Sequence, residues 1–478
     1  MSETQQHHGL QSTLTLAPYI LKTNPPRVGG STYRIPAELG RLLVPEKRSD
    51  PDSRLIELAF VRLKSTAAQP GPPLIFLAGG PGSSGIDAFR SARLQSWLTA
   101  LREVGDVIAL DQRGIGMSVP CLDSCETLDI PLDRPGERNE ILEIYRQKSC
   151  ASMAFWQNQG VDLAGYTTEE SADDIDALRR ALGYKKVHLY GASYGSHLAL
   201  ATIKRHPDAL ARVVVGMVEG PDHTIKLPGN IQQHLEHISQ LAQQDSRLSY
   251  AIPNLLDTMR SVVQRLEQDP VTVSVKDKGT GKEDNVTVGA FDLQYITAVG
   301  IASRRFIAYL PSRYYAMMKG DFSWLAGEVL AWRRGWLGSA MMFHMDSASG
   351  ASPERLAQIQ QEAPTTLLGD TIDFPFPRIA DAWGSPDLGP AFRAPIQSDI
   401  PTLFISGTLD GRTPASNAEE VRTGFSNNYH IIVDGAAHST PDHVNVPHVR
   451  AAMIDFLQGN PVTVTHANNP FEFVPVEV

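Results

Sequence analysis

The sequence contains few cysteines, no long apolar run and no excess of positive charge. Three cysteines in 478 residues are too few for a scaffold built on disulfides. The longest apolar stretches, such as 74–78 and 213–218, fall far short of the roughly 18 residues that suggest a membrane-spanning helix. Lys and Arg number 43 against 53 Asp and Glu, which gives a net charge of −10. We therefore expect neither a membrane protein nor a nucleic-acid binder, because an acidic surface repels phosphate.

The N-terminal segment and the cysteines bear on the compartment. Residues 1–20 contain no basic region followed by an apolar core, so they do not predict a secretory signal. As given, the chain is expected to be cytoplasmic, whereas a processed or re-engineered start would fit a secreted or periplasmic protein. Cys121, Cys125 and Cys150 lack the second pair and nearby histidines of a zinc site. One disulfide, joining Cys121 or Cys125 to Cys150, is compatible with export, and three reduced thiols are the alternative.

Short apolar runs alternate with helical segments along much of the chain. Residues 55–62 alternate like a strand, and the runs 73–78 and 106–111 each end in a polar or glycine-rich turn. Alternation of this kind predicts an α/β fold whose mostly parallel sheet is covered by helices on both faces.

The pattern changes at about residue 220. Amphipathic helical segments dominate up to about 395, with a hairpin-like piece at 271–288. This part is rich in Trp and Met, which favours the interior of a helical domain over a pocket lining. The sequence thus predicts five parts: an N-terminal arm (1–40), the first part of the sheet core (41–219), a helical cap (220–395), the second part of the core (396–458) and an extended tail (459–478).

The clearest motif is the segment 191–195, GASYG, which fits G-x-S-x-G. It follows a predicted strand at 185–190 and begins a helix that is predicted to end near 206. Small residues at both ends of this motif permit a turn so tight that the serine hydroxyl stands exposed above the sheet. A helix N-cap would explain Ser193 but not the two glycines. Ser193 is therefore the predicted nucleophile.

A serine nucleophile needs a base, and the base needs an acid that orients it. Asp410 follows a predicted strand in GTLDGRTP, and His438 follows the next one in GAAHST. Both have the chain order and the loop position that a nucleophile elbow requires. The competing residues are less well placed: His430, His443, His448, Asp434 and Asp442.

Acyl transfer also needs two backbone amides that bind the developing oxyanion. The amide of Tyr194, directly after the nucleophile, is one expected donor. The other is expected from the segment 78–82, AGGPG, where glycines let the backbone approach a substrate closely. Gly80 is the favoured donor there, and a plain Gly-Pro turn is the alternative.

With these motifs, the chain resembles the proline iminopeptidase and tripeptidyl aminopeptidase family of serine peptidases, within the α/β-hydrolase fold. The resemblance rests on five segments in this order: GGPGSSG (79–85), DQRGIGMS (111–118), GASYGS (191–196), SGTLDGRTP (406–414) and GAAHS (435–439). It implies a helical cap inserted before the acid loop, which agrees with the long interval between Ser193 and Asp410. It also implies release of residues or short peptides from free N-termini, with the amine held by carboxylates near the cap. Glu219 and Asp222 are the candidates for that role.

The predicted reaction proceeds through an acyl-enzyme and needs no metal or organic cofactor. The expected partner is a small peptide or ester substrate, and the sequence does not predict an oligomeric state. A carboxylesterase or lactonase is the enzymatic alternative, because the same triad serves esters and amides. A catalytically silent binding protein with this fold is the alternative of another class.

Overall fold

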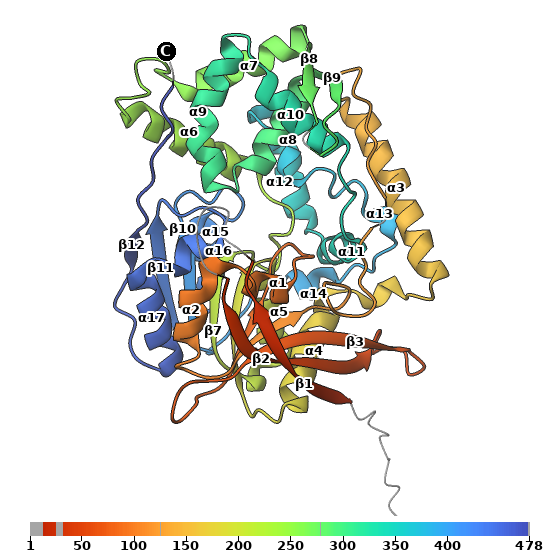
Figure 1. The fold of residues 1–478 in the computed structure, drawn as a ribbon, viewed down its shortest axis with the longest axis vertical. Coiled ribbons are helices and arrows are strands. Elements are labelled where there is room, and N and C mark those ends of the chain that lie inside the picture. Colours follow the sequence, from red (N-terminus) through yellow and green to blue (C-terminus); the bar gives the residue numbers. More distant parts are fainter. Residues whose placement is uncertain (1–12, 25–31, 125, 278, 477–478) are drawn as a thin grey trace, which may run out of the picture.

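The computed structural model describes residues 13–24, 32–124, 126–277 and 279–476 (Figure 1). These residues form a ten-stranded sheet in the order β1-β2-β3-β5-β4-β6-β7-β10-β11-β12. The strands from β5 to β12 in this order run parallel, whereas β1, β2 and β3 are antiparallel to their neighbours. The bounds are β1 (Leu14–Lys22), β2 (Arg34–Pro45), β3 (Leu55–Leu63), β4 (Leu74–Leu77), β5 (Val107–Asp111), β6 (Val187–Ser193), β7 (Leu210–Val218), β10 (Thr402–Gly407), β11 (Asn428–Asp434) and β12 (His466–Asn468). The predicted mostly parallel sheet is confirmed.

Helices cover both faces of this sheet because its central strands are apolar on both sides. In β4, Ile75 and Leu77 pack into one core cluster, and Leu74 and Phe76 pack into the other, as alternating strand residues must. The first face is covered by α4 (Thr168–Ala181) and α5 (Tyr194–Arg205), and the second by α2 (Gln95–Leu101) and α17 (Pro447–Gln458). Shorter helices complete the core: α1 (Gly85–Phe89), α15 (Ala415–Arg422) and α16 (Thr440–Val444).

A mainly helical insertion separates β7 from β10 and lies beyond one edge of the sheet (Figure 1). Its side chains build a third core cluster. The elements are α6 (Pro228–Gln244), α7 (Leu255–Gln268), β8 (Val271–Lys276), β9 (Glu283–Val288), α8 (Ala290–Gly300), α9 (Arg304–Met318), α10 (Ser323–Arg333), α11 (Ala340–Ser349), α12 (Pro353–Glu362), α13 (Ala380–Trp383) and α14 (Gly389–Arg393). The strands β8 and β9 form the antiparallel hairpin expected near 271–288.

One long helix of the first core part packs beside this insertion. The helix α3 (Arg138–Asn158) runs alongside α11 and α13 (Figure 1). The ring of Tyr145 on α3 meets Phe374 of the insertion edge-on, at 5.7 Å between centroids. The part that covers the sheet edge is therefore built from two separate stretches of chain, whereas the sequence pattern assigned it to 220–395 alone.

The N-terminal residues differ from the predicted arm. Within 1–40, β1 and the first half of β2 pair with each other and extend the sheet at its antiparallel edge. Residues 14–20 of β1 are mostly exposed, so the strand is held by backbone hydrogen bonds and leaves no burial pattern in the sequence.

The C-terminal tail contacts both the sheet and the insertion. β12 pairs with β11 at the sheet edge, and the amide of Val474 donates to the carbonyl of Ala308 on α9 at 2.9 Å. Phe473 is buried within the core of the insertion. The tail therefore joins the two parts of the molecule.

Two sequence expectations concern cysteines and membranes. Cys121 and Cys150 are free thiols, and Cys125 lies outside the described residues. Among the described helices, none combines the length and the apolar character that crossing a membrane requires.

Candidate active site

Ser193 lies at a sharp turn between β6 and α5. Its backbone has φ 56° and ψ −128°, a conformation that residues other than glycine rarely adopt. The turn can be this tight only because glycines stand on both sides of Ser193, at positions where there is no room for a side chain. A Cβ on Gly191 would lie 2.1 Å from the carbonyl oxygen of Gly195, and a Cβ on Gly195 would lie 2.1 Å from that of Leu77. Ser193 is partly exposed while its neighbours are buried, so its hydroxyl is presented at the sheet edge.

His438 joins Ser193 to Asp410. Its Nε2 lies 2.9 Å from Ser193 Oγ, and its Nδ1 lies 2.9 and 3.0 Å from the two carboxylate oxygens of Asp410. When Nδ1 carries a proton for the carboxylate, Nε2 is free to accept the serine proton. The structure thus brings together the three residues that were predicted for nucleophile, acid and base.

These three residues meet because they follow parallel strands. Asp410 comes after β10 and His438 after β11, and these strands are neighbours that run in the same direction as β6. The carboxyl ends of such strands lie at one edge of the sheet, where open α/β sheets bind their ligands.

The environment of Asp410 keeps it ionised. Asp410 is 2% exposed, and its carboxylate accepts hydrogen bonds of 2.9 Å from the amides of Arg412 and Thr413 and from the Thr413 hydroxyl. Burial opposes ionisation, but His438 and these donors outweigh it and lower the pKa of Asp410 to about 2. Asp410 is therefore charged at neutral pH and can orient the imidazole.

The competing histidines are engaged or enclosed elsewhere. His430 lies 2.6 Å from Glu419 and 2.9 Å from Ser406 Oγ. His443 is fully buried, and among the described residues its ring nitrogens have no hydrogen-bond partner. Burial lowers the pKa of His443 to about 4, so this ring stays neutral.

The glycine loop after β4 lies directly against the nucleophile. A Cβ on Gly79 would lie 3.0 Å from the Cβ of Ser193, and Gly80 has φ 118°, which glycine adopts without steric cost. The backbone can therefore approach a substrate bound at Ser193. The roles of the Gly80 and Tyr194 amides as oxyanion donors stay a prediction.

Asp111 braces this loop. One carboxylate oxygen accepts from the Ser84 hydroxyl at 2.6 Å and from the Ile86 amide at 3.0 Å, and the other accepts from the Met117 amide at 2.8 Å. Asp111 thus ties the segment after the glycines to the loop after β5.

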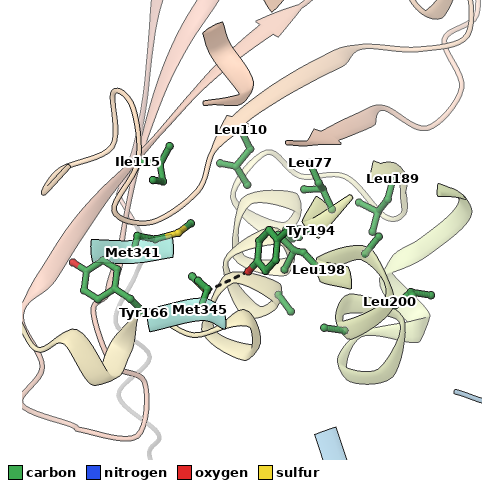
Figure 2. Close-up of a cluster of buried hydrophobic side chains, with 14 of the residues drawn as sticks. Leu77, Leu110, Ile115, Tyr166, Leu189, Tyr194, Leu198, Leu200, Met341 and Met345 are labelled. Atoms are coloured by element: carbon green, nitrogen blue, oxygen red, sulfur yellow. Dashed lines mark hydrogen bonds between the residues drawn. The ribbon is translucent and has the colours of Figure 1, made fainter. Parts of the chain in front are cut away.

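The side chain of Tyr194 connects the elbow to the insertion. Its ring is fully buried, and its hydroxyl donates to Met345 Sδ of α11 at 3.2 Å (Figure 2). The same hydroxyl lies 3.1 Å from Thr168 Oγ1 at the start of α4. Tyr194, the first residue of α5, is therefore held in place by contacts with α4 and α11.

A cavity of about 350 Å³ opens beside Gly80, between the glycine loop and the insertion. Trp336, which is 66% exposed, belongs to its lining. Six further aromatic side chains line it: Tyr145, Tyr295, Trp332, Phe343, Phe374 and Phe376. Four charged residues line it as well: Lys226, Asp346, Asp373 and Arg412.

The two acidic side chains of this cavity resist ionisation. Burial raises the pKa of Asp373 to about 6, although its carboxylate accepts from the backbone amide of Lys226 at 2.7 Å. Burial, and then repulsion from Glu219, raises the pKa of Asp346 well above its usual range. Within the described part of the chain, the Asp346 carboxylate makes no hydrogen bond or ion pair. A cationic group that enters the cavity would therefore stabilise the ionised form of both carboxylates.

The carboxylates of Glu219 and Asp222 are engaged elsewhere, and neither belongs to the cavity lining. Glu219 is buried and forms an ion pair of 3.1 Å with Lys226. Both oxygens of Asp222 accept from Ser352, one from its amide at 2.7 Å and one from its hydroxyl at 2.6 Å. The segment after β7 thus joins core and insertion, and the cavity carboxylates come from Asp346 and Asp373 instead. No motif in the sequence marks these two aspartates.

One family model matches most of the chain. The family model described as "alpha/beta hydrolase fold" matches residues 72–442. The chain belongs to this family. The thermophilic esterase of Thermogutta terrifontis, a solved structure, is 16% identical with a TM-score of 0.36, covering 88% of this chain and 98% of that one.

Three curated relatives carry the names of peptidases. The tripeptidyl aminopeptidase of Streptomyces coelicolor is 31% identical over 39% of this chain and 36% of its own length. A serine protease of Mycobacterium bovis is 30% identical over 41% of this chain and 39% of its own length. The proline iminopeptidase of Xylella fastidiosa is 26% identical over 30% and 32%. The chain thus matches only about a third of the length of these relatives.

Proposed function

We propose that the protein is a serine hydrolase that cleaves its substrate through a covalent acyl-enzyme. The observation that carries this proposal is the unbroken series of hydrogen bonds from Asp410 through His438 to Ser193. This arrangement is the one that activates a serine hydroxyl at neutral pH.

The reaction follows from the positions of these groups. His438 Nε2 takes the proton of Ser193 as Oγ attacks the substrate carbonyl carbon, and the amides of Gly80 and Tyr194 bind the oxyanion. The bond to the leaving group then breaks, and the leaving group takes the proton from His438. Water, deprotonated by the same imidazole, attacks the acyl-enzyme and releases the acid and Ser193. Throughout, the ionised Asp410 stabilises the imidazolium.

The proposed substrate is a peptide with a free N-terminal amine. Asp346 and Asp373 lie in a cavity that Gly80 also lines, so a peptide whose scissile carbonyl sits at Gly80 can direct its amine to them. The ammonium group would stabilise both carboxylates in the ionised form. The names of the curated relatives, two of them aminopeptidases, support the same substrate class. This assignment replaces Glu219 and Asp222 as the amine site.

A substrate panel tests the class of substrate. Aminoacyl, dipeptidyl and tripeptidyl 4-nitroanilides, each free and N-acetylated, are compared with 4-nitrophenyl esters. We expect the free anilides to be cleaved and the acetylated ones to be resistant. Ester turnover without anilide cleavage would favour the carboxylesterase or lactonase alternative, and equal rates for free and acetylated anilides would contradict the amine site.

Covalent labelling tests the nucleophile independently of the substrate. A fluorophosphonate should label the protein, and Ser193→Ala should abolish the label. Ser261→Ala, an exposed serine of α7, is the matched control and should be labelled like the wild type. A wild-type protein that stays unlabelled would favour the silent binding protein.

A further inference from the structure

A second cavity, of about 600 Å³, lies beside His438, the proposed base. His438 is part of its wall, and the start of α9 contributes Arg304 and Arg305. The tail contributes Phe471. This cavity has no lining residue in common with the one beside Gly80. The two spaces are therefore separate, one at the oxyanion loop and one at the imidazole.

The lining of the second cavity contains more positively than negatively charged side chains. Three arginines line it against two acidic residues. Arg93 is paired with Asp442 at 3.1 Å, and Glu472 faces Arg247 at 3.6 Å. Across the described residues, no carboxylate lies within ion-pair distance of Arg304 or Arg305. Two guanidinium groups without a carboxylate partner among the described residues thus line the cavity that His438 also lines, in a chain whose net charge is −10.

The two arginines are held differently. The guanidinium of Arg304 donates to Asn469 Oδ1 at 3.1 Å and to the carbonyl of Pro470, so the tail fixes its direction. Arg305 is exposed, and its guanidinium lies 6.0 Å from the centre of the Tyr309 ring. Arg304 therefore holds the tail against α9, whereas Arg305 can be replaced without breaking a hydrogen bond to the tail.

We propose that this cavity is the subsite for the leaving portion of the substrate, and that its arginines bind a carboxylate there. The inference rests on the proposed function: because His438 must return its proton to the leaving nitrogen, that nitrogen lies at Nε2, and the leaving portion extends from it into the space that His438 lines. Guanidinium groups recognise carboxylates through paired hydrogen bonds. The carboxylate is either the C-terminus of a short leaving peptide or an Asp or Glu side chain.

The test compares leaving groups at a constant acyl portion. The aminoacyl, dipeptidyl or tripeptidyl group that is cleaved fastest as a 4-nitroanilide is coupled to Ala-OH and to Ala-NH2, and separately to Asp-NH2 and to Asn-NH2. The measured quantity is the ratio of kcat/KM between the acidic and the neutral member of each pair. General effects of a substitution on activity cancel in this ratio.

We expect a ratio of about 5 for at least one pair in the wild type, the size typical of an exposed ion pair. The pair that shows it identifies the carboxylate. Arg305→Gln should lower the ratio toward one, and Arg305→Glu should lower it further. Arg260→Gln, an exposed arginine of α7, should leave it unchanged.

Two results would overturn the subsite while leaving the peptidase intact: wild-type ratios of one or less in both pairs, or a raised ratio that neither Arg305 variant changes. Failure to cleave any member of the anilide panel would instead defeat the proposed peptidase, and the subsite with it. Thermal unfolding of both variants separates these results from loss of the fold.

Discussion

The hydroxyl of Tyr194 donates to the sulfur of Met345, and the next residue on α11 is Asp346. The backbone amide proposed for the oxyanion and a carboxylate proposed for the substrate amine are thus connected through one buried contact. We therefore expect the spacing between the sites for the scissile carbonyl and for the N-terminal amine to depend on this contact.

Removing this hydroxyl tests the connection. Tyr194→Phe leaves the buried ring in place but removes the bonds to Met345 and Thr168. We expect a loss of about 1 kcal/mol in the free energy of unfolding and a rise in KM for free-amine peptides. Circular dichroism during chemical denaturation and steady-state kinetics measure the two effects. Tyr250→Phe, whose ring is largely exposed, is the control and should change neither quantity.

Replacing Asp410 by Asn should impair the chemical step severely. The amide is neutral and can hold His438 in the wrong tautomer, which costs about 10⁴ in kcat in a comparable triad. Asp434→Asn, at the end of β11, should retain activity because this side chain belongs to neither cavity. Equal kcat values for wild type and Asp410→Asn would contradict the assigned acid.

The affinity for free-amine substrates should depend on pH through Asp373. With its pKa at about 6, this carboxylate is ionised at pH 8 and protonated at pH 5, so KM should rise as the pH falls through 6. Asp373→Asn should raise KM at pH 8 by about tenfold, the value of one charged hydrogen bond, and should remove the part of the pH dependence of KM that is centred near pH 6. Asp257→Asn, at an exposed aspartate of α7, is the matched control. A KM that is unaffected by Asp373→Asn would place the amine elsewhere.

The same substitution should stabilise the protein at high pH. A carboxyl whose folded pKa is raised favours folding below its unfolded pKa and loses that contribution as the pH rises through the folded value. The shift of Asp373 from 3.8 to about 6 makes ionisation in the folded state cost up to about 3 kcal/mol. Asp373→Asn should therefore raise the unfolding free energy at pH 8 and have little effect at pH 4. Denaturant unfolding at both values measures this difference.

The tail should contribute to the stability of the insertion. Phe473 is 5% exposed within its core, so Phe473→Ala should cost about 3 kcal/mol. Phe155→Ala, at an aromatic residue of α3 that is 44% exposed, should cost less. Similar losses for both variants would show that the tail does not pack on the insertion in solution.

The sequence predicted those features whose signals are local. The turn at Ser193 needs glycines at fixed positions, and Asp410 and His438 each follow an apolar strand, so order and position predicted the three residues that the structure brings together. The strand β1 was missed because an exposed edge strand is held by backbone hydrogen bonds, which any sequence can make.

The cavity carboxylates were missed for a different reason. Asp346 lies on α11 and Asp373 in a short turn before Phe374, and they meet only through the packing of the insertion. Glu219 and Asp222 were the candidates because the family resemblance implies carboxylates near the cap that hold the substrate amine. Lys226 and Ser352 occupy them instead, and neither partner can be inferred from spacing along the chain.

The exposed position of Trp336 in the cavity lining gives the protein an optical reporter. Trp97 and Trp383 are fully buried and their emission should be insensitive to ligands, whereas an indole that passes from water into contact with a bound peptide shifts its emission to shorter wavelength. Titrating Ser193→Ala with an uncleaved peptide would therefore yield its dissociation constant from fluorescence. Trp332 also lines the cavity, so the part of the signal that Trp336→Phe removes is the contribution of Trp336.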